Sequence, residues 1–222
     1  MLTIAFDLDG TLIDTAPDLI DTLNVTLTRE GLRTVGFEDA RPMIGGGARV
    51  MIERALATEG IQTTKPDVDR MFKEFIDHYA DHIADRSRPF PFLENTLDQL
   101  AADGHRLAVC TNKLEWLAVK LLKTLKLDQH FACICGQDTF KVMKPDPQIL
   151  LGTVKRAGGN PKLAVMVGDS GADIRIARAA SVPVIAVDFG YTEVPIETLH
   201  PDKIISSYAD LPDAISAVTG KH

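Results

Sequence analysis

The segment AFDLDGTLID, residues 5 to 14, decides the fold predicted for the rest of the chain. An apolar run typical of a buried strand ends in two aspartates one residue apart, and a Gly-Thr turn follows. Two like charges at the end of a buried strand repel each other. The segment therefore predicts that Asp7 and Asp9 face a cation and a phosphate, with the remaining groups supplied from elsewhere in the chain.

The composition is that of a soluble globular protein. The 222 residues are 45% hydrophobic and 25% charged, with a formal net charge of −7. No apolar run reaches the roughly 18 residues that cross a bilayer, so we expect no membrane partner. The N-terminus lacks the basic region and cleavage site of a signal peptide, and we expect a cytoplasmic location. Without a basic stripe we expect no nucleic-acid partner, but a small anionic substrate is compatible with this charge.

Cysteine and histidine spacing gives little support for a soft-metal site. The three cysteines show no CxxC spacing, which argues against a disulfide framework and a zinc site. His78 and His82 lie four residues apart on an expected helix, but no third ligand is near them in sequence. We interpret both histidines as surface residues.

Short apolar runs rich in β-branched residues alternate with helical patterns, as in a parallel sheet covered on both faces. We expect strands at residues 2–7, 106–112, 131–136, 163–169 and 182–188. We expect helices at residues 93–104, 114–125, 146–158, 172–181 and 209–220, where the pattern is helical. The second of these helices carries Trp116, which we expect in the core. The alternation predicts an α/β fold with a doubly wound, Rossmann-like parallel sheet.

One helical segment interrupts this alternation directly after the first strand. Apolar stripes run through residues 16–31 and 66–83, and a small all-α bundle would bury them. We therefore predict an inserted helical domain at residues 15–88. The α/β core domain would consist of residues 1–14 and 89–222, with a semi-rigid hinge at the proline-containing joints.

Polar side chains follow the expected strands at the edge where ligands bind in doubly wound sheets. They are Asp7, Asp9, Thr111, Asn112, Lys144, Asp169 and Asp173. Each alone fits a turn, a helix cap or a solvated lysine, but their joint occurrence at one edge is harder to explain structurally. Converging carboxylates repel unless a cation compensates them, and an all-oxygen ligand set suits Mg²⁺.

The motifs together resemble those of a known superfamily. The DLDGT segment at 7–11, Thr111, Lys144 and the GDSGAD segment at 168–173 resemble the four signature motifs of the haloacid dehalogenase superfamily. The resemblance spans the chain, and the helical insert resembles the C1-type cap of that superfamily. The stretches IGGGARVMIERAL, VCTNK and KPDP are most similar to its phosphoglycolate phosphatase branch.

The resemblance implies a Mg²⁺-dependent phosphomonoesterase whose small phosphorylated substrate is 2-phosphoglycolate. Asp7 would attack phosphorus and form an aspartyl-phosphate, and Asp9 would act as general acid and then general base. Asp7, the backbone carbonyl of Asp9, and Asp169 would hold the metal ion.

The remaining motif residues would bind the phosphoryl group. The resemblance implies that Thr111, the amide of Asn112 and Lys144 contact its oxygens. Asp173 would position Lys144 or a metal-bound water, and a pure capping role is the alternative.

The cap would supply substrate specificity. Gly45, Gly46 and Gly47 would let the backbone approach the substrate, and Arg49 would reach a substrate carboxylate. The alternative is that Arg49 lies on the solvated face of a helix. The resemblance also implies glycine at two positions that this chain fills with Phe92 and Ser181.

Other functions stay open at this point. A phosphatase or phosphomutase acting on a sugar phosphate or another small phosphate ester would use the same pair of aspartates. A binding or regulatory module without catalysis would not need every catalytic group, and all of them are present. The oligomeric state is not predicted.

Overall fold

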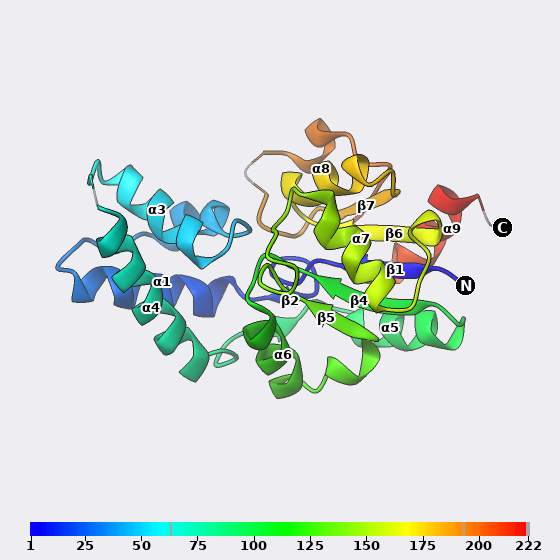
Figure 1. Ribbon diagram of the computed structural model, residues 1–222, viewed down its shortest axis with the longest axis horizontal. Coiled ribbons are helices and arrows are strands. Elements are labelled where there is room, and N and C mark those ends of the chain that lie inside the picture. Colours follow the sequence, from blue (N-terminus) through cyan, green and yellow to red (C-terminus); the bar gives the residue numbers. More distant parts are fainter. Residues whose placement is uncertain (63, 193, 221–222) are drawn as a thin grey trace.

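The computed structural model describes residues 1–62, 64–192 and 194–220 and consists of a sheet core and a group of helices beside it (Figure 1). The core contains a six-stranded parallel sheet in the order β5-β4-β1-β6-β7-β8. These strands are β1 (Thr3–Phe6), β4 (Arg106–Cys110), β5 (Cys133–Cys135), β6 (Ala164–Gly168), β7 (Val184–Val187) and β8 (Lys203–Ile205). The predicted α/β fold is confirmed, and β8 is an edge strand of three residues that the sequence did not predict.

Helices cover both faces of the sheet. Successive strand residues point to opposite faces, so the apolar strands place hydrophobic side chains on both faces, where helices pack on them. Ile4 and Phe6 of β1 belong to one apolar cluster and Ala5 to the other. Figure 1 shows α5 and α6 on the opposite side of the sheet from α7 and α8. The core helices are α5 (Leu93–Ala102), α6 (Glu115–Thr124), α7 (Pro147–Arg156), α8 (Gly171–Ala179) and α9 (Leu211–Thr219).

Helix α6 corrects one prediction. Leu117 and Leu121 are buried, but Trp116 is 47% exposed and does not belong to the core. Neighbouring residues on an α-helix point about 100° apart, so a side chain next to the buried stripe faces solvent.

The remaining helices form the helical unit, which lies beyond the carboxyl ends of the central strands and away from both termini (Figure 1). It consists of α1 (Ala16–Arg29), α2 (Phe37–Ala40), α3 (Ala48–Thr58) and α4 (Lys65–Asp81). Helix α4 packs against both α1 and α3. One apolar cluster runs from Leu8 and Leu12 of the core into Leu19 and Phe75 of this unit. The predicted domain boundaries at residues 15–88 stay a prediction.

The chain enters and leaves the helical unit through a two-stranded antiparallel pair, β2 (Ile13–Asp14) and β3 (Arg88–Pro89). Asp18, in the first turn of α1, is 3% exposed and links the segment that enters the helical unit to the segment that leaves it. Its carboxylate accepts hydrogen bonds from the Arg86 N–H, from the Ser87 N–H at 2.8 Å and from the Ser87 hydroxyl at 2.6 Å. These bonds restrict the joint that we predict to be a semi-rigid hinge.

We expect Asp18→Ala to lower the free energy of unfolding by about 2–3 kcal/mol, because several buried donors lose their acceptor. Urea denaturation measures the change. Asp21→Ala is the matched control, since Asp21 lies on the same helix, is exposed and pairs with Arg86 at the surface. Its expected cost is below about 1 kcal/mol. Equal, small effects of the two substitutions would contradict a locking role for Asp18.

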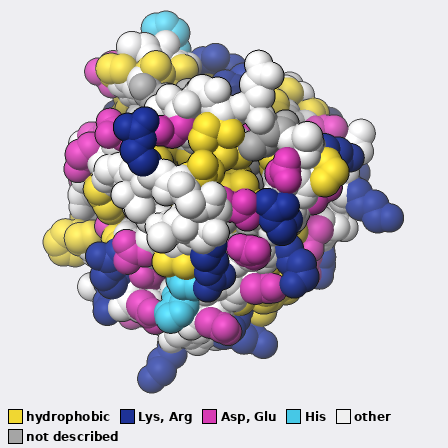
Figure 2. Space-filling model, turned by 90° about the vertical axis from the view of Figure 1, so that its left-hand side faces the viewer, with side chains coloured by type: hydrophobic (Ala, Val, Ile, Leu, Met, Phe, Trp, Pro, Cys, Tyr) yellow, Lys and Arg dark blue, Asp and Glu magenta, His cyan; other side chains and the backbone are white. Residues whose placement is uncertain are grey.

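The surface at the end formed by the helical unit carries charges of both signs. Figure 2 shows the end formed by the helical unit, where acidic and basic side chains are intermixed around a central group of hydrophobic ones. None of the helices in the described part of the chain is both long and apolar enough to cross a membrane.

Candidate active site

The carboxyl ends of β1, β4 and β6 carry three of the polar side chains that the sequence singled out. Asp7 follows β1, Thr111 follows β4, and Asp169 follows β6. The parallel register of β1 with both neighbouring strands puts these ends level. All three side chains are buried. The sheet therefore brings them to one edge, as predicted.

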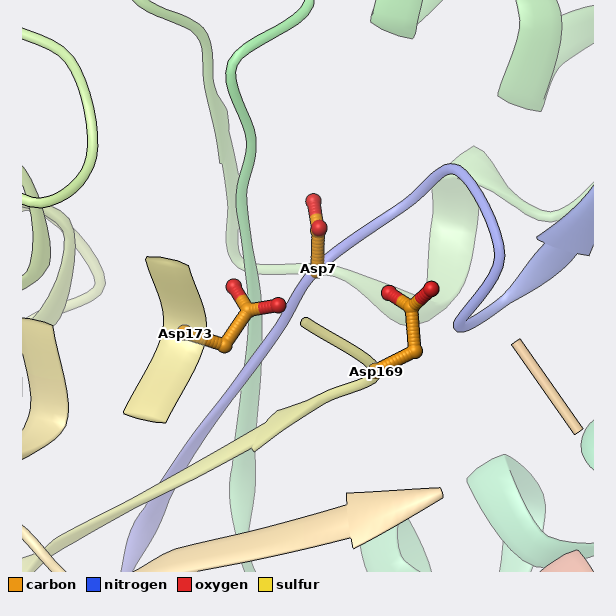
Figure 3. A group of neighbouring side chains, drawn as sticks. All are labelled: Asp7, Asp169 and Asp173. Carbon is orange, nitrogen blue, oxygen red and sulfur yellow. The ribbon is translucent and has the colours of Figure 1, made fainter. Parts of the chain in front are cut away.

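Three carboxylates meet at this edge. Asp7, Asp169 and Asp173 each offer an oxygen atom within 4.8 Å of the others. Figure 3 shows Asp7 on the loop after β1, Asp169 on the segment after β6 and Asp173 on α8, with their carboxylates around a common space. The carboxylate of Asp9 is not part of this group, and the prediction assigned its backbone carbonyl, not its side chain, to the metal.

Lys144 lies between two of these carboxylates. Its Nζ is 2.8 Å from Asp7 Oδ2 and 2.7 Å from Asp173 Oδ1, and its side chain is fully buried. Its backbone N–H donates to Asn112 Oδ1 at 2.8 Å. Asp173 also caps α8, because its Oδ2 accepts from the Ser170 N–H and hydroxyl. Asp173 thus contacts Lys144 and caps the helix at the same time, and its role at the site stays a prediction.

The cluster carries an excess of negative charge. Burial, reinforced by Asp173 and Asp169 and opposed by Lys144, raises the pKa of Asp7 to about 8. Burial and the nearby Asp173 raise the pKa of Asp169 to about 6. Burial acts to lower the pKa of Lys144, but Asp173 and Asp7 outweigh it and keep that pKa above its ordinary value. Three ionised carboxylates and one ammonium leave two negative charges, which one divalent cation would neutralise.

The orientation of Asp169 is fixed by its neighbours. Its Oδ1 accepts from the Thr11 hydroxyl at 2.9 Å, and its Oδ2 accepts from the Tyr191 N–H at 2.7 Å. Gly10 has a φ of +80°, and a Cβ there would lie 2.4 Å from Asp169 Oδ2. Only glycine allows this close approach. Sequence reasoning missed Tyr191, because its contact is made by the backbone and leaves no side-chain signal.

Asp9 has a separate set of partners at the border with the helical unit. Its Oδ1 accepts from the Thr15 hydroxyl at 2.8 Å and from Lys113 Nζ at 2.7 Å, and its Oδ2 accepts from Lys113 Nζ at 2.9 Å. The Lys113 ammonium also lies 4.6 Å from the centre of the Tyr79 ring of α4. Lys113 was not predicted, although its place directly after Thr111 and Asn112 at the end of β4 was a usable signal.

A pocket lies between the core and the helical unit, and Asp7, Asp9 and Thr111 line its core side. Apolar residues of α1, α3 and α4 and the glycine loop before α3 line its other side. In that loop, the Gly45 carbonyl accepts from Asn112 Nδ2 at 3.2 Å. Gly47 has a φ of +87°, and a Cβ there would lie 3.2 Å from the Asn112 carbonyl oxygen. The predicted glycine loop therefore adjoins the site.

The other two residues predicted to supply substrate specificity lie differently. Gly46 packs against α3, where a Cβ would lie 2.7 Å from the Val50 side chain. The Arg49 guanidinium is 40% exposed, pairs with Asp69 at 2.7 Å and lies 4.8 Å from the centre of the Phe72 ring. Arg49 is not among the residues that line the pocket. This position fits the alternative that Arg49 lies on the solvated face of a helix.

The histidine pair makes no comparable cluster. His78 and His82 stack with ring centres 4.4 Å apart, and His82 is half exposed and contacts Asp85. Among the described residues, the group of three that could hold a metal ion is the aspartate cluster.

A family model for haloacid dehalogenase-like hydrolases matches residues 4–187, which include all seven candidate side chains at the sheet edge. The chain belongs to this family. The resemblance drawn from the four motifs is therefore confirmed. This haloacid dehalogenase-like hydrolase is an enzyme of the phosphatase class.

Two curated relatives cover nearly the whole chain. A phosphoglycolate phosphatase of Agrobacterium fabrum is 48% identical over 95% of this chain and 90% of its own. A phosphoglycolate phosphatase of Mesorhizobium japonicum is 47% identical over 92% of this chain and 90% of its own. The crystal structure of a predicted phosphoglycolate phosphatase from Haemophilus somnus 129pt superposes with a TM-score of 0.86 at 29% identity, covering 96% of this chain and 97% of that one.

The raised pKa values of this haloacid dehalogenase-like hydrolase predict how its stability depends on pH without metal. Folded Asp7 and Asp169 have pKa values of about 8 and about 6, above the ordinary 3.8, so the folded state keeps protons that the unfolded chain releases. Stability therefore falls as pH rises from about 4 to about 8. We expect the free energy of unfolding in EDTA to drop by about 3–4 kcal/mol between pH 5.5 and 8, most of it from Asp7.

Saturating Mg²⁺ should remove most of that drop, because a cation replaces the bound protons. Asp7→Asn is the comparison variant and should show a much smaller decline in EDTA. Urea denaturation at the two pH values measures both effects. An unchanged decline in Asp7→Asn would show that the aspartate cluster is not its source.

Proposed function

We propose that this enzyme hydrolyses 2-phosphoglycolate to glycolate and inorganic phosphate, with Mg²⁺ as cofactor and an aspartyl-phosphate on Asp7 as intermediate. The observation that carries the proposal is the buried Asp7 carboxylate, 2.8 Å from the Lys144 ammonium and exposed to a pocket between the core and the helical unit. The names of the curated relatives support phosphoglycolate as the substrate.

In the first step an Asp7 oxygen attacks phosphorus, and the bond from phosphorus to the leaving-group oxygen breaks. Lys144, the Thr111 hydroxyl and the backbone N–H of Asn112 bind the phosphoryl oxygens, where charge must be stabilised. Lys144 is suited to this work because Asp173 on its other side holds the ammonium in place. Little reorganisation is then needed when the substrate arrives.

Asp9 donates a proton to the departing glycolate oxygen. It then takes a proton from the water that attacks phosphorus and releases phosphate from Asp7. Glycolate is a poor leaving group without that proton, so this step matters more for 2-phosphoglycolate than for an aryl phosphate. The helical unit serves as a cap that keeps bulk water from the intermediate.

Mg²⁺ fits the donor set at the sheet edge. Asp7, Asp169 and the backbone carbonyl of Asp9 would hold it, and Asp173 stands beside them. When bound, the ion supplies positive charge that offsets the repulsion between the Asp7 carboxylate and the phosphoryl group. The fixed orientation of Asp169 by Thr11 and Tyr191 serves this ligand role.

A panel of phosphate monoesters tests the proposal. The purified enzyme is assayed for phosphate release from 2-phosphoglycolate, hexose phosphates and an aryl phosphate, with Mg²⁺ and with EDTA. We expect 2-phosphoglycolate to have the highest kcat/KM and EDTA to abolish release. Preference for a hexose phosphate, or its conversion to an isomer, would replace the substrate assignment. Release that is insensitive to EDTA would remove the metal from the proposal.

A further inference from the structure

Lys113 is a cation inside the pocket between the core and the helical unit. Among the described residues that line this pocket it is the one basic side chain. Its side chain is only 6% exposed, and its charge partner is Asp9. A buried ammonium without an anion is costly, so Lys113 needs a negative partner at every stage of a reaction in this pocket.

The contact with Lys113 occupies Asp9. Oδ1 of Asp9 accepts from Thr15 and from Lys113, and Oδ2 accepts from Lys113. If Asp9 assists the leaving group, as the proposed function requires, one of its oxygens must turn toward the substrate. Lys113 then loses part of its partner, and a second anion must take that place.

The opposite wall of the pocket offers few other polar groups. It is built from apolar side chains such as Met51, Phe72 and Phe75, together with Tyr79. The Tyr79 side chain is 1% exposed, and its hydroxyl has no hydrogen-bond partner within the described part of the chain. Burial raises the pKa of Tyr79 well above its ordinary value, so this hydroxyl stays a proton donor. A buried donor without a protein partner is available to a water molecule or to a ligand atom that enters the pocket.

Lys113 and Tyr79 are close enough to serve one ligand group. The ammonium lies 4.6 Å from the centre of the Tyr79 ring, so the core and α4 meet at this point. Together they present an ammonium and a phenol hydroxyl in otherwise apolar surroundings, which suits a small carboxylate. Arg49, the residue predicted for this role from the sequence, is engaged by Asp69 outside the pocket.

We propose that Lys113 determines leaving-group specificity by exchanging the Asp9 carboxylate for an anionic group of the substrate, with the Tyr79 hydroxyl as a second donor. This inference rests on the proposed function and names its substrate class as phosphate monoesters that carry a carboxylate close to the ester oxygen. An anionic substrate draws Lys113 away and frees an Asp9 oxygen for the leaving group. A neutral ester leaves Lys113 bound to Asp9 and reacts slowly.

The test compares 2-phosphoglycolate with its uncharged carboxamide and with ethyl phosphate, all with Mg²⁺. We expect wild-type kcat/KM to be about 100-fold or more higher for 2-phosphoglycolate than for each neutral ester. The reason is that a neutral ester would leave buried polar groups of the site without a partner. Lys113→Met should lower kcat/KM for 2-phosphoglycolate about 100-fold and raise kcat/KM for the neutral esters, because Lys113 no longer holds the Asp9 carboxylate. Lys113→Arg should retain part of the preference.

Two further variants sharpen the test. Tyr79→Phe keeps the ring and removes the hydroxyl, and it should raise KM about tenfold for 2-phosphoglycolate alone. Lys123→Met removes an exposed lysine of α6, and kcat/KM should stay at the wild-type value for every substrate. Urea denaturation of each variant shows that it is folded.

The outcomes separate the inference from the function on which it rests. Equal losses for charged and neutral esters in Lys113→Met would overturn the inference, because Lys113 would then only position Asp9. A wild-type enzyme that cleaves charged and neutral esters equally well would overturn it without any variant. A wild-type enzyme that cleaves none of these esters would overturn the proposed function itself, and the inference with it.

Discussion

Asp7→Asn should lower kcat for phosphate release at least about ten-thousand-fold, with the fold unchanged. The amide has nearly the shape of the carboxylate but lacks the negative charge that attacks phosphorus. It also leaves the cluster with one carboxylate fewer, so the metal-free variant should be no less stable than the wild type at pH 8. Phosphate release from 2-phosphoglycolate and urea denaturation measure the two expectations.

The control for Asp7→Asn must exclude a contaminating phosphatase. Asp103→Asn changes an exposed aspartate at the end of α5 and should retain full activity after the same purification. Asp7→Ala, which cannot revert by deamidation, should match Asp7→Asn. Turnover within about tenfold of the wild type in both Asp7 variants would contradict a covalent mechanism on this residue.

Lys144→Met should impair activity and stability together. The variant loses a phosphoryl-binding cation, and we expect kcat/KM to fall about a thousand-fold. It also leaves Asp7, Asp169 and Asp173 without their ammonium, so we expect the metal-free protein to lose about 3–5 kcal/mol of unfolding free energy at pH 8. The loss should shrink at pH 5.5, where Asp7 and Asp169 take up protons.

Two measurements isolate the role of Lys144. Saturating Mg²⁺ should restore part of the lost stability but not the activity, because the metal offsets charge without replacing the contact to the phosphoryl group. Lys155→Met, at an exposed lysine of α7, should alter neither quantity. A Lys144→Met protein as stable in EDTA at pH 8 as the wild type would contradict the account of the charge balance.

The residues at the sheet edge could be predicted from the sequence, because each of them directly follows the strand that places it there. Each apolar run predicts a strand. When the strands are parallel, the polar residue that follows each run lies at the carboxyl edge of the sheet. Asp7, Thr111 and Asp169 follow that rule, and the structure brings them together. Their chemical roles stay predictions that the experiments above test.

Contacts between distant segments could not be predicted in this way. The pairing of Lys113 with Asp9 depends on how the loop after β4 faces the loop after β1. The hydrogen bond from Tyr191 to Asp169 uses only a backbone N–H. Trp116 was misassigned because an aromatic residue beside a leucine stripe was counted as part of it.

The backbone is left-handed at two positions where the sequence resemblance implied glycine. The resemblance implied glycine where this chain has Phe92 and Ser181, and both adopt left-handed conformations, with φ of 66° and 55°. Such a conformation costs a side chain about 1–2 kcal/mol, which glycine would avoid. Glycine at these two turns would therefore have a physical advantage, and this chain folds despite the cost.

The proposed mechanism depends on transfer of the phosphoryl group from the substrate to the Asp7 carboxylate. The most direct measurement mixes enzyme, Mg²⁺ and 2-phosphoglycolate, quenches within one turnover, reduces acyl phosphates with borohydride and maps the modified residue by peptide mass spectrometry. We expect homoserine at position 7, formed only when Mg²⁺ is present. Full release of phosphate in the same turnover, with unmodified aspartate at position 7 at every quench time or with the modification on another residue, would contradict it.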